Sequence, residues 1–130
     1  SGRHERERCS IMGIVIDYTK GFFEASPAGE TVGDITTGTL DLSTGNVFSD
    51  APSANVTYAF SNPPATGSAY GFTLKVTPSA TVTVTWPASV DWAGGTAPDA
   101  PASGATNVYS FYTQDGGTVY YGFLAGGAMA

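Results

Sequence analysis

Charge is scarce in this sequence, and positive charge is scarcest. Lysine and arginine together number 5 among 130 residues, against 11 acids, for a formal net charge of −6. Three of those cations, Arg3, Arg6 and Arg8, lie at the N-terminus, and the rest of the chain is strongly acidic. Nucleic-acid binding needs a stripe of basic residues that displaces counterions from phosphates. We therefore expect no nucleic-acid partner.

Histidine and cysteine occur once each, as His4 and Cys9. A single cysteine cannot form a disulfide within the chain, and we expect a free thiol. These two residues do not supply the four ligands of a tetrahedral zinc site. A Ser-His-Asp or Cys-His nucleophile would have to bring one of them into a cleft. The sequence therefore predicts no zinc site, no nucleophilic catalytic site and no cofactor.

Long apolar segments and helical periodicity are missing too. No apolar run approaches the roughly 20 residues that a membrane-spanning helix needs. The short apolar stretch at residues 12–17 contains a charge and does not resemble a signal peptide. Apolar residues nowhere recur at helical spacing over a run of ten. We expect neither membrane insertion nor a helical domain.

The clearest positive pattern is the alternation of residues 81–86, in which Val82, Val84 and Trp86 alternate with threonines. A period of two in β-branched residues predicts a strand with one buried face. Pro87 should end this strand because it has no N–H to donate. The turn-like residues 91–95 should then bring Trp92, the second tryptophan, close to the first.

The remaining chain repeats this pattern in short segments that are separated by glycine and proline. Two aromatic segments, 107–113 and 118–124, flank Asp-Gly-Gly, which is a strong hairpin signal. We predict seven to nine short antiparallel strands. The fold class is all-β, an antiparallel β-sandwich or jelly-roll-like single domain at 12–130, with an extended N-terminal arm at 1–11. The arm differs in composition and is read as an expression remnant, a processed leader or a partner-binding segment. The predicted core comprises Tyr58, Phe72, Leu74, Val82, Val84, Trp86, Phe111 and Tyr121.

Two sets of residues are candidates for chemistry or binding. Asp91 and Asp99 flank the Trp92 loop and could serve as a glycosidase pair or as calcium ligands, but their turn-like surroundings favour turn-capping aspartates. The second set comprises Trp86, Trp92, Tyr112 and Tyr120. With both tyrosines on the outer face of the hairpin, these rings could form a sugar-stacking platform. Core or subunit-interface packing is the favoured interpretation of the tryptophans.

Several motifs in order resemble a module of tailed-bacteriophage virion proteins. In that family a VTWP-x-x-V-x-W-x-GG-x-x-P segment precedes an aromatic strand, a DGGT turn and a terminal YGF strand. The matching segments of this sequence are 82–92, 94–98, 109–113, 115–118 and 121–123. The resemblance extends over roughly residues 40–130.

The resemblance implies a non-enzymatic structural protein on the virion surface, assembled in the host cytoplasm. It implies a homotrimer that contacts other virion proteins, either as a capsid decoration or as a tail-fibre component. The positive arm with Arg3, Arg6 and Arg8 could then grip a neighbouring protein. The alternative is a carbohydrate-binding or host-receptor-binding module that recognises a surface glycan. The position of the tryptophans discriminates between the two: buried rings favour structure, and exposed coplanar rings favour sugar binding.

Overall fold

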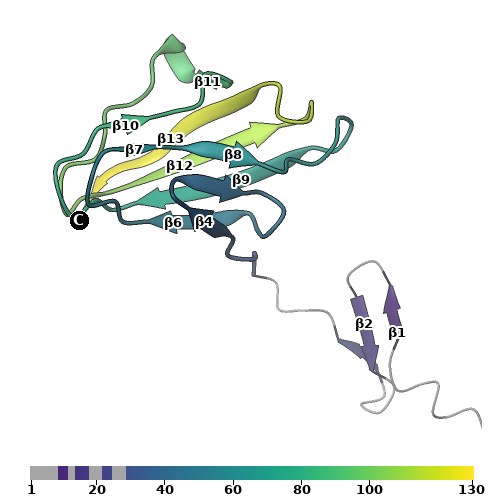
Figure 1. Cartoon of the computed structure of the whole chain (residues 1–130). Coiled ribbons are helices and arrows are strands. Elements are labelled where there is room, and N and C mark those ends of the chain that lie inside the picture. The colour runs from purple at the N-terminus through teal and green to yellow at the C-terminus, as the bar shows by residue number, and fades with distance from the viewer. Residues whose placement is uncertain (1–8, 12–13, 18–21, 25–28) are drawn as a thin grey trace, which may run out of the picture. The chain divides into compact units, whose positions relative to one another are not determined.

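The computed structural model describes residues 9–11, 14–17, 22–24 and 29–130. The chain divides into two compact units, Ser1–Glu30 and Thr31–Ala130 (Figure 1). The predicted division lay after Ile11, whereas the boundary between the compact units falls after Glu30. The described part of the first unit is a three-stranded antiparallel sheet in the order β1-β2-β3. Its strands are β1 (Cys9–Ile11), β2 (Ile14–Asp17) and β3 (Phe22–Glu24).

The second unit contains a five-stranded sheet with the order β11-β13-β12-β9-β6. Its central strands β9, β12 and β13 are antiparallel, and β12 and β13 form the hairpin that the Asp-Gly-Gly signal predicts. The edge strands β6 and β11 run parallel to their neighbours. The bounds are β6 (Val47–Asp50), β9 (Tyr70–Val76), β11 (Val90–Trp92), β12 (Thr106–Thr113) and β13 (Tyr120–Met129). A short 3₁₀ turn, Ala93–Gly95, follows β11.

Two smaller sheets form the opposite layer. One has the order β4-β5-β8, and the other pairs β7 with β10. Tyr58 lies between β7 and β8, so one extended run serves both sheets, as Figure 1 shows. Phe60 of β8 contacts Phe72 and Phe111 of the five-stranded sheet, with ring centroids 5.0 and 5.1 Å apart. The strands are β4 (Asp34–Thr36), β5 (Thr39–Asp41), β7 (Val56–Thr57), β8 (Ala59–Ser61) and β10 (Val84–Thr85).

The described chain is all-β, as predicted, and its layers are consistent with a β-sandwich. The strand pairing differs from the purely antiparallel prediction, because four of the described strand pairs are parallel. Parallel strands cannot be joined by a tight hairpin and need a longer crossover. Each of these pairs joins segments that are separated by other elements in the chain, and a local hydrophobic pattern contains no signal for such pairing.

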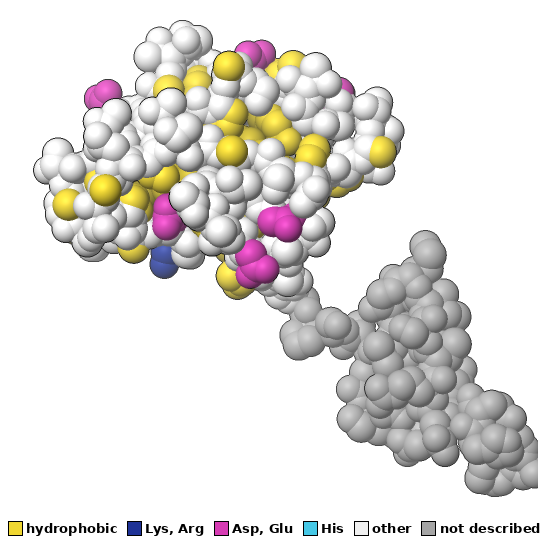
Figure 2. All heavy atoms as spheres, viewed as in Figure 1, with side chains coloured by type: hydrophobic (Ala, Val, Ile, Leu, Met, Phe, Trp, Pro, Cys, Tyr) yellow, Lys and Arg dark blue, Asp and Glu magenta, His cyan; other side chains and the backbone are white. Residues whose placement is uncertain are grey.

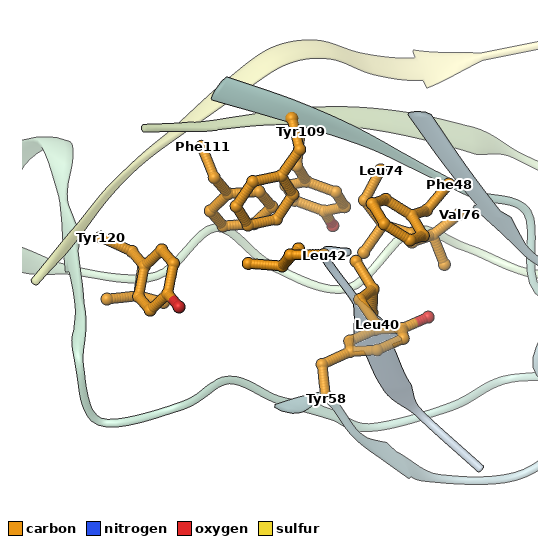
Figure 3. Close-up of a cluster of buried hydrophobic side chains, with 11 residues drawn as sticks. Leu40, Leu42, Phe48, Tyr58, Leu74, Val76, Tyr109, Phe111 and Tyr120 are labelled. Carbon is orange, nitrogen blue, oxygen red and sulfur yellow. The ribbon is translucent and has the colours of Figure 1, made fainter. Parts of the chain in front are cut away.

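The core lies between the layers and is rich in aromatic rings. Figure 3 shows Tyr109 and Phe111 on one side of the cluster and Tyr58 on the other, with Leu40 and Leu42 between them. The predicted core positions of Phe72, Leu74 and Phe111 are confirmed, because every second residue from Phe72 in β9 and from Asn107 in β12 is buried. The fully or nearly buried hydrophobic residues are Leu40, Leu42, Phe48, Tyr58, Phe72, Leu74, Val76, Val82, Val90, Tyr109, Phe111 and Tyr120.

The predicted strand at residues 81–86 keeps its alternation but forms only a short ladder. Val82 is buried and Val84 and Trp86 are half-buried, whereas the intervening threonines are exposed. The ladder itself is limited to β10, which pairs with the two residues of β7. At its start, the Oδ1 of Asn55 accepts a hydrogen bond from the backbone N–H of Thr83 at 2.8 Å. A side chain thus replaces a strand partner at this position.

The β12–β13 turn determines which face of β13 is buried. Asp115 Oδ1 accepts hydrogen bonds from the Val119 N–H at 3.0 Å and from the Thr113 hydroxyl at 3.1 Å. Val119 therefore belongs to the turn, and β13 begins one residue later with Tyr120 facing inward. The predicted core position of Tyr121 is wrong, because this residue is 45% exposed.

Candidate interaction face

The side of the five-stranded sheet that faces away from the core is the outer face. Its side chains come from the positions that alternate with the buried rows. The register aligns them in three rows across the strands. The rows are Asp91–Tyr121–Tyr112–Gly71, Phe123–Ser110–Thr73 and Val108–Lys75.

Three aromatic side chains cluster on the outer face. Tyr112, Tyr121 and Phe123 are 38%, 45% and 49% exposed. The rings of Tyr112 and Tyr121 lie 6.4 Å apart at an interplanar angle of 29°. The Tyr112 hydroxyl donates a hydrogen bond to Gln114 Oε1 at 2.5 Å, which fixes the orientation of the ring. The solvent face of an antiparallel sheet is normally polar, so a contiguous aromatic cluster there indicates an interaction surface.

The two charged residues of the outer face lie at opposite corners of it. Asp91 is on edge strand β11 beside Tyr121, and Lys75 is on β9 beside Val108. Both side chains are exposed, and neither forms an ion pair within the described part of the chain. Lys75 is also the one cation of residues 31–130. The face therefore has an apolar centre with one negative and one positive corner.

The two tryptophans lie on the core side and pack against each other. Trp86 and Trp92 are half-buried, with ring centroids 5.1 Å apart and planes at 66°. Trp86 also makes an edge contact with Tyr109 at 4.7 Å and stacks on Tyr58 at 5.1 Å. The predicted proximity of the two tryptophans is confirmed. Their rings are not coplanar, and they close one end of the aromatic core.

Trp92 also explains the glycine within β13. A Cβ added at Gly122 would lie 2.8 Å from Val90 Cγ1 and 3.0 Å from Trp92 Cε3. Only glycine lets the indole pack this close to the strand.

Tyr120, predicted on the outer face beside Tyr112, is only 3% exposed. Its ring contacts Phe60 at a centroid distance of 4.8 Å in the core. Burial, followed by the charge of Asp115, raises the pKa of the Tyr120 phenol. The outer partner of Tyr112 is Tyr121, which the sequence reasoning assigned to the core. No local signal in the sequence distinguishes the two tyrosines, because apolar residues occur at both parities of this segment.

The other sequence candidates are not brought together into a site. Asp91 and Asp99 are both exposed; Asp91 belongs to the outer face, whereas Asp99 lies in the loop after the 3₁₀ turn. A groove of about 440 Å³ beside Asp99 is lined mainly by small apolar and proline residues, together with Leu124 and Asn107. The described residues contain no group of three or more potential metal ligands. Arg3, Arg6, Arg8 and His4 lie outside the described residues.

Buried polar groups are satisfied within the described core. The Tyr58 hydroxyl donates a hydrogen bond to Asp50 Oδ2 at 2.8 Å. Burial, strengthened by this bond, raises the pKa of the Tyr58 phenol well above its ordinary value. In the described residues no buried side-chain nitrogen or oxygen lacks a partner. The core thus offers no orphaned polar group that would indicate a ligand.

The surface of the second unit shows few charges. Figure 2 shows scattered acidic groups and hydrophobic side chains on the visible face, where polar and backbone atoms predominate. In the part of the chain that the structure describes, no helix has the length and apolar character needed to cross a membrane.

Comparisons with protein-family models, curated proteins and solved structures find no significant match to this chain.

Proposed function

We propose that this chain is a non-catalytic structural module of the surface of a tailed-bacteriophage particle. The observation that carries the proposal is the tryptophan pair. Trp86 and Trp92 pack edge to face, and Trp86 lies against Tyr58 and Tyr109, so both indoles serve the fold. Coplanar exposed indoles, which sugar binding would favour, are not what this geometry provides. The motif resemblance supplies the identity of the particle.

The proposed module self-associates and contacts other virion proteins, as a capsid decoration or as part of a tail fibre. The aromatic outer face supports this role, because aromatic residues are enriched at the centres of protein interfaces. The resemblance implies a homotrimer for such modules. The basic arm with Arg3, Arg6 and Arg8 is a proposed contact to an acidic neighbour, which salt should weaken.

The test is to locate the chain on purified particles from the source that encodes it. Antibodies raised against residues 31–130 should label intact particles in negative-stain electron microscopy, at the capsid or at the tail. Antibodies against a protein from inside the particle serve as the control and should label only disrupted particles. Particles that lack the chain, by labelling and by mass spectrometry, would overturn the proposal.

A second candidate function, glycan binding, is favoured by the exposed rings of Tyr112 and Tyr121 beside Asp91. Aromatic faces bind the apolar face of a sugar, and a carboxylate can accept hydrogen bonds from its hydroxyls. A glycan array probed with the purified chain tests this function. Binding that Tyr121→Ala abolishes, and that Leu124→Thr leaves unchanged, would favour it. Leu124 is a suitable control because it is 42% exposed and pairs with the buried Tyr109, on the opposite side of the sheet from the outer face.

A further inference from the structure

We propose that a second copy of this chain packs against the outer face, sheet to sheet, around a two-fold axis. Each copy contributes Phe123 and Tyr112 near the axis and pairs its Asp91 with the partner's Lys75. This inference specifies the surface for the self-association proposed above. It is independent of where the chain lies on a particle, because it is tested on the purified chain alone.

The register places the aromatic residues between the two charged corners. Asp91 and Lys75 are separated by three strand spacings across the sheet and by two rows along the strands. With strands about 4.8 Å apart and about 6.7 Å per two residues, the Cα atoms of the two corners are roughly 20 Å apart. The midpoint of this line falls between Phe123 and Ser110. Within one copy, Asp91 and Lys75 are therefore too far apart to form an ion pair.

A two-fold axis explains why opposite charges occupy opposite corners. Consider an axis that lies in the plane of the face, passes through that midpoint and is perpendicular to the Asp91–Lys75 line. Rotation by 180° about this axis exchanges the two corners. Each Asp91 then lies over the partner's Lys75, and the contact occurs twice. A two-fold interface is self-complementary in this way. Any ion pair between two copies of the second unit must involve Lys75, because it is the one cation of that unit.

The side chains of the face also complement each other in size. The large residues Tyr121 and Phe123 lie on β13, on the Asp91 side of the midpoint. The small residues Ser110, Thr73 and Gly71 lie on the other side. The same axis places the large side of one copy over the small side of the other. Outer-face rings and small side chains can thus interdigitate as they do between packed sheets.

The size of the face predicts a weak dimer. Five strands span about 20 Å, and the three rows with their flanks span about the same length, which gives on the order of 400 Å² per copy. Stable interfaces bury about 800 Å² per partner, so association should be weak and should appear only at high protein concentration. The resemblance implies a trimer instead, and the mass of the assembly distinguishes the two.

The experiment is sedimentation equilibrium of the full chain up to about 1 mM, with a charge-exchange cycle. Wild type should approach twice 13.3 kDa. Lys75→Glu and Asp91→Lys should each weaken dimerisation about tenfold, because each change replaces two attractive contacts with like-charge pairs. The double variant should recover to within about threefold of wild type. Phe123→Thr should weaken the dimer at least tenfold. Leu124→Thr should not change it, because Leu124 is exposed on the opposite side of the sheet.

Recovery in the double variant is the decisive result. The two residues cannot reach each other within one copy, so only contact between copies restores the pairing. A chain that stays monomeric up to 1 mM overturns the proposal. So does a dimer or trimer whose mass is insensitive to these changes, or a double variant that is weaker than either single variant. Circular dichroism of each variant confirms that it is folded before its mass is interpreted.

Discussion

Tyr120 and Tyr121 are adjacent in the sequence but have opposite environments, so truncating each to alanine tests the register of β13. Tyr120 is 3% exposed and packs on Phe60 and Phe72, at centroid distances of 4.8 and 6.0 Å. Truncating a buried aromatic ring typically destabilises a protein by about 3–5 kcal/mol, through lost burial and the cavity left behind. Tyr121 is 45% exposed, and its one ring contact within the described residues is to Tyr112. Loss of one exposed cross-strand pair should cost about 0.2–1 kcal/mol.

Urea unfolding followed by tryptophan fluorescence measures this difference. Trp86 and Trp92 both contact core rings, so their emission should change when the core opens. A denaturant dependence of about 1–2 kcal/mol per molar urea converts a difference of about 3 kcal/mol into a midpoint separation of about 1.5–3 M. Measurements at micromolar protein concentration avoid any contribution from association.

Comparable destabilisation by Tyr120→Ala and Tyr121→Ala would refute the register. A larger effect of Tyr121→Ala would restore the pattern expected from the sequence, with residue 121 inward. If Tyr120→Ala does not fold, Tyr120→Leu keeps much of the buried volume and should still cost more than Tyr121→Leu. The order of the two positions, and not the absolute value, decides the outcome.

Three further predictions follow from the core and the hairpin turn. Gly122→Ala should destabilise the unit by about 1–3 kcal/mol in urea unfolding, because its Cβ would lie 2.8 Å from Val90 Cγ1; a neutral effect would contradict the close packing at this strand. The hydrogen bond from the Val119 N–H lowers the pKa of Asp115 below its ordinary 3.8. The stability that this carboxylate contributes is therefore present above pH 3.8 and lost as the pH falls through the lower folded value. The urea midpoint of wild type should decline below about pH 4 more steeply than that of Asp115→Asn, and equal slopes would exclude this contribution. Burial raises the pKa of Tyr58, so the unfolded chain ionises first, and stability should fall as the pH rises above 10. Tyr58→Phe should reduce that alkaline loss, as measured by circular dichroism against pH, and an unchanged alkaline profile would assign the loss to other groups.

The part of the fold that the sequence predicts is the part with a strict period of two. In β9 large apolar residues alternate with small or polar ones, and in β12 Tyr109 and Phe111 flank Ser110, so one face is favoured for burial and the prediction is correct. The segment Val119–Phe123 has apolar residues at both parities. Either register buries aromatic rings, and the choice depends on the hydrogen bonds of Asp115 and on space for Trp92.

The candidate site was predictable to a similar degree. The outward position of Tyr112 follows from the alternation of β12, and the contact between Trp86 and Trp92 follows from the turn between them. The membership of Tyr121, Asp91 and Lys75 in one face does not follow from any local pattern. It depends on the parallel pairing of β11 with β13 and on the position of β9, two strands from β13 in the sheet. Both are set by contacts between segments that are distant in the sequence.

The position of β13 has a consequence for synthesis. In the strand order β11-β13-β12-β9-β6, β13 lies between two strands that are both synthesised before it. Until residues 120–129 leave the ribosome, β11 has no ladder and β12 has one open side. Contacts that join distant segments form slowly, and the contacts of β13 must also wait for its own synthesis. A chain interrupted before residue 120 should therefore lack a closed five-stranded sheet.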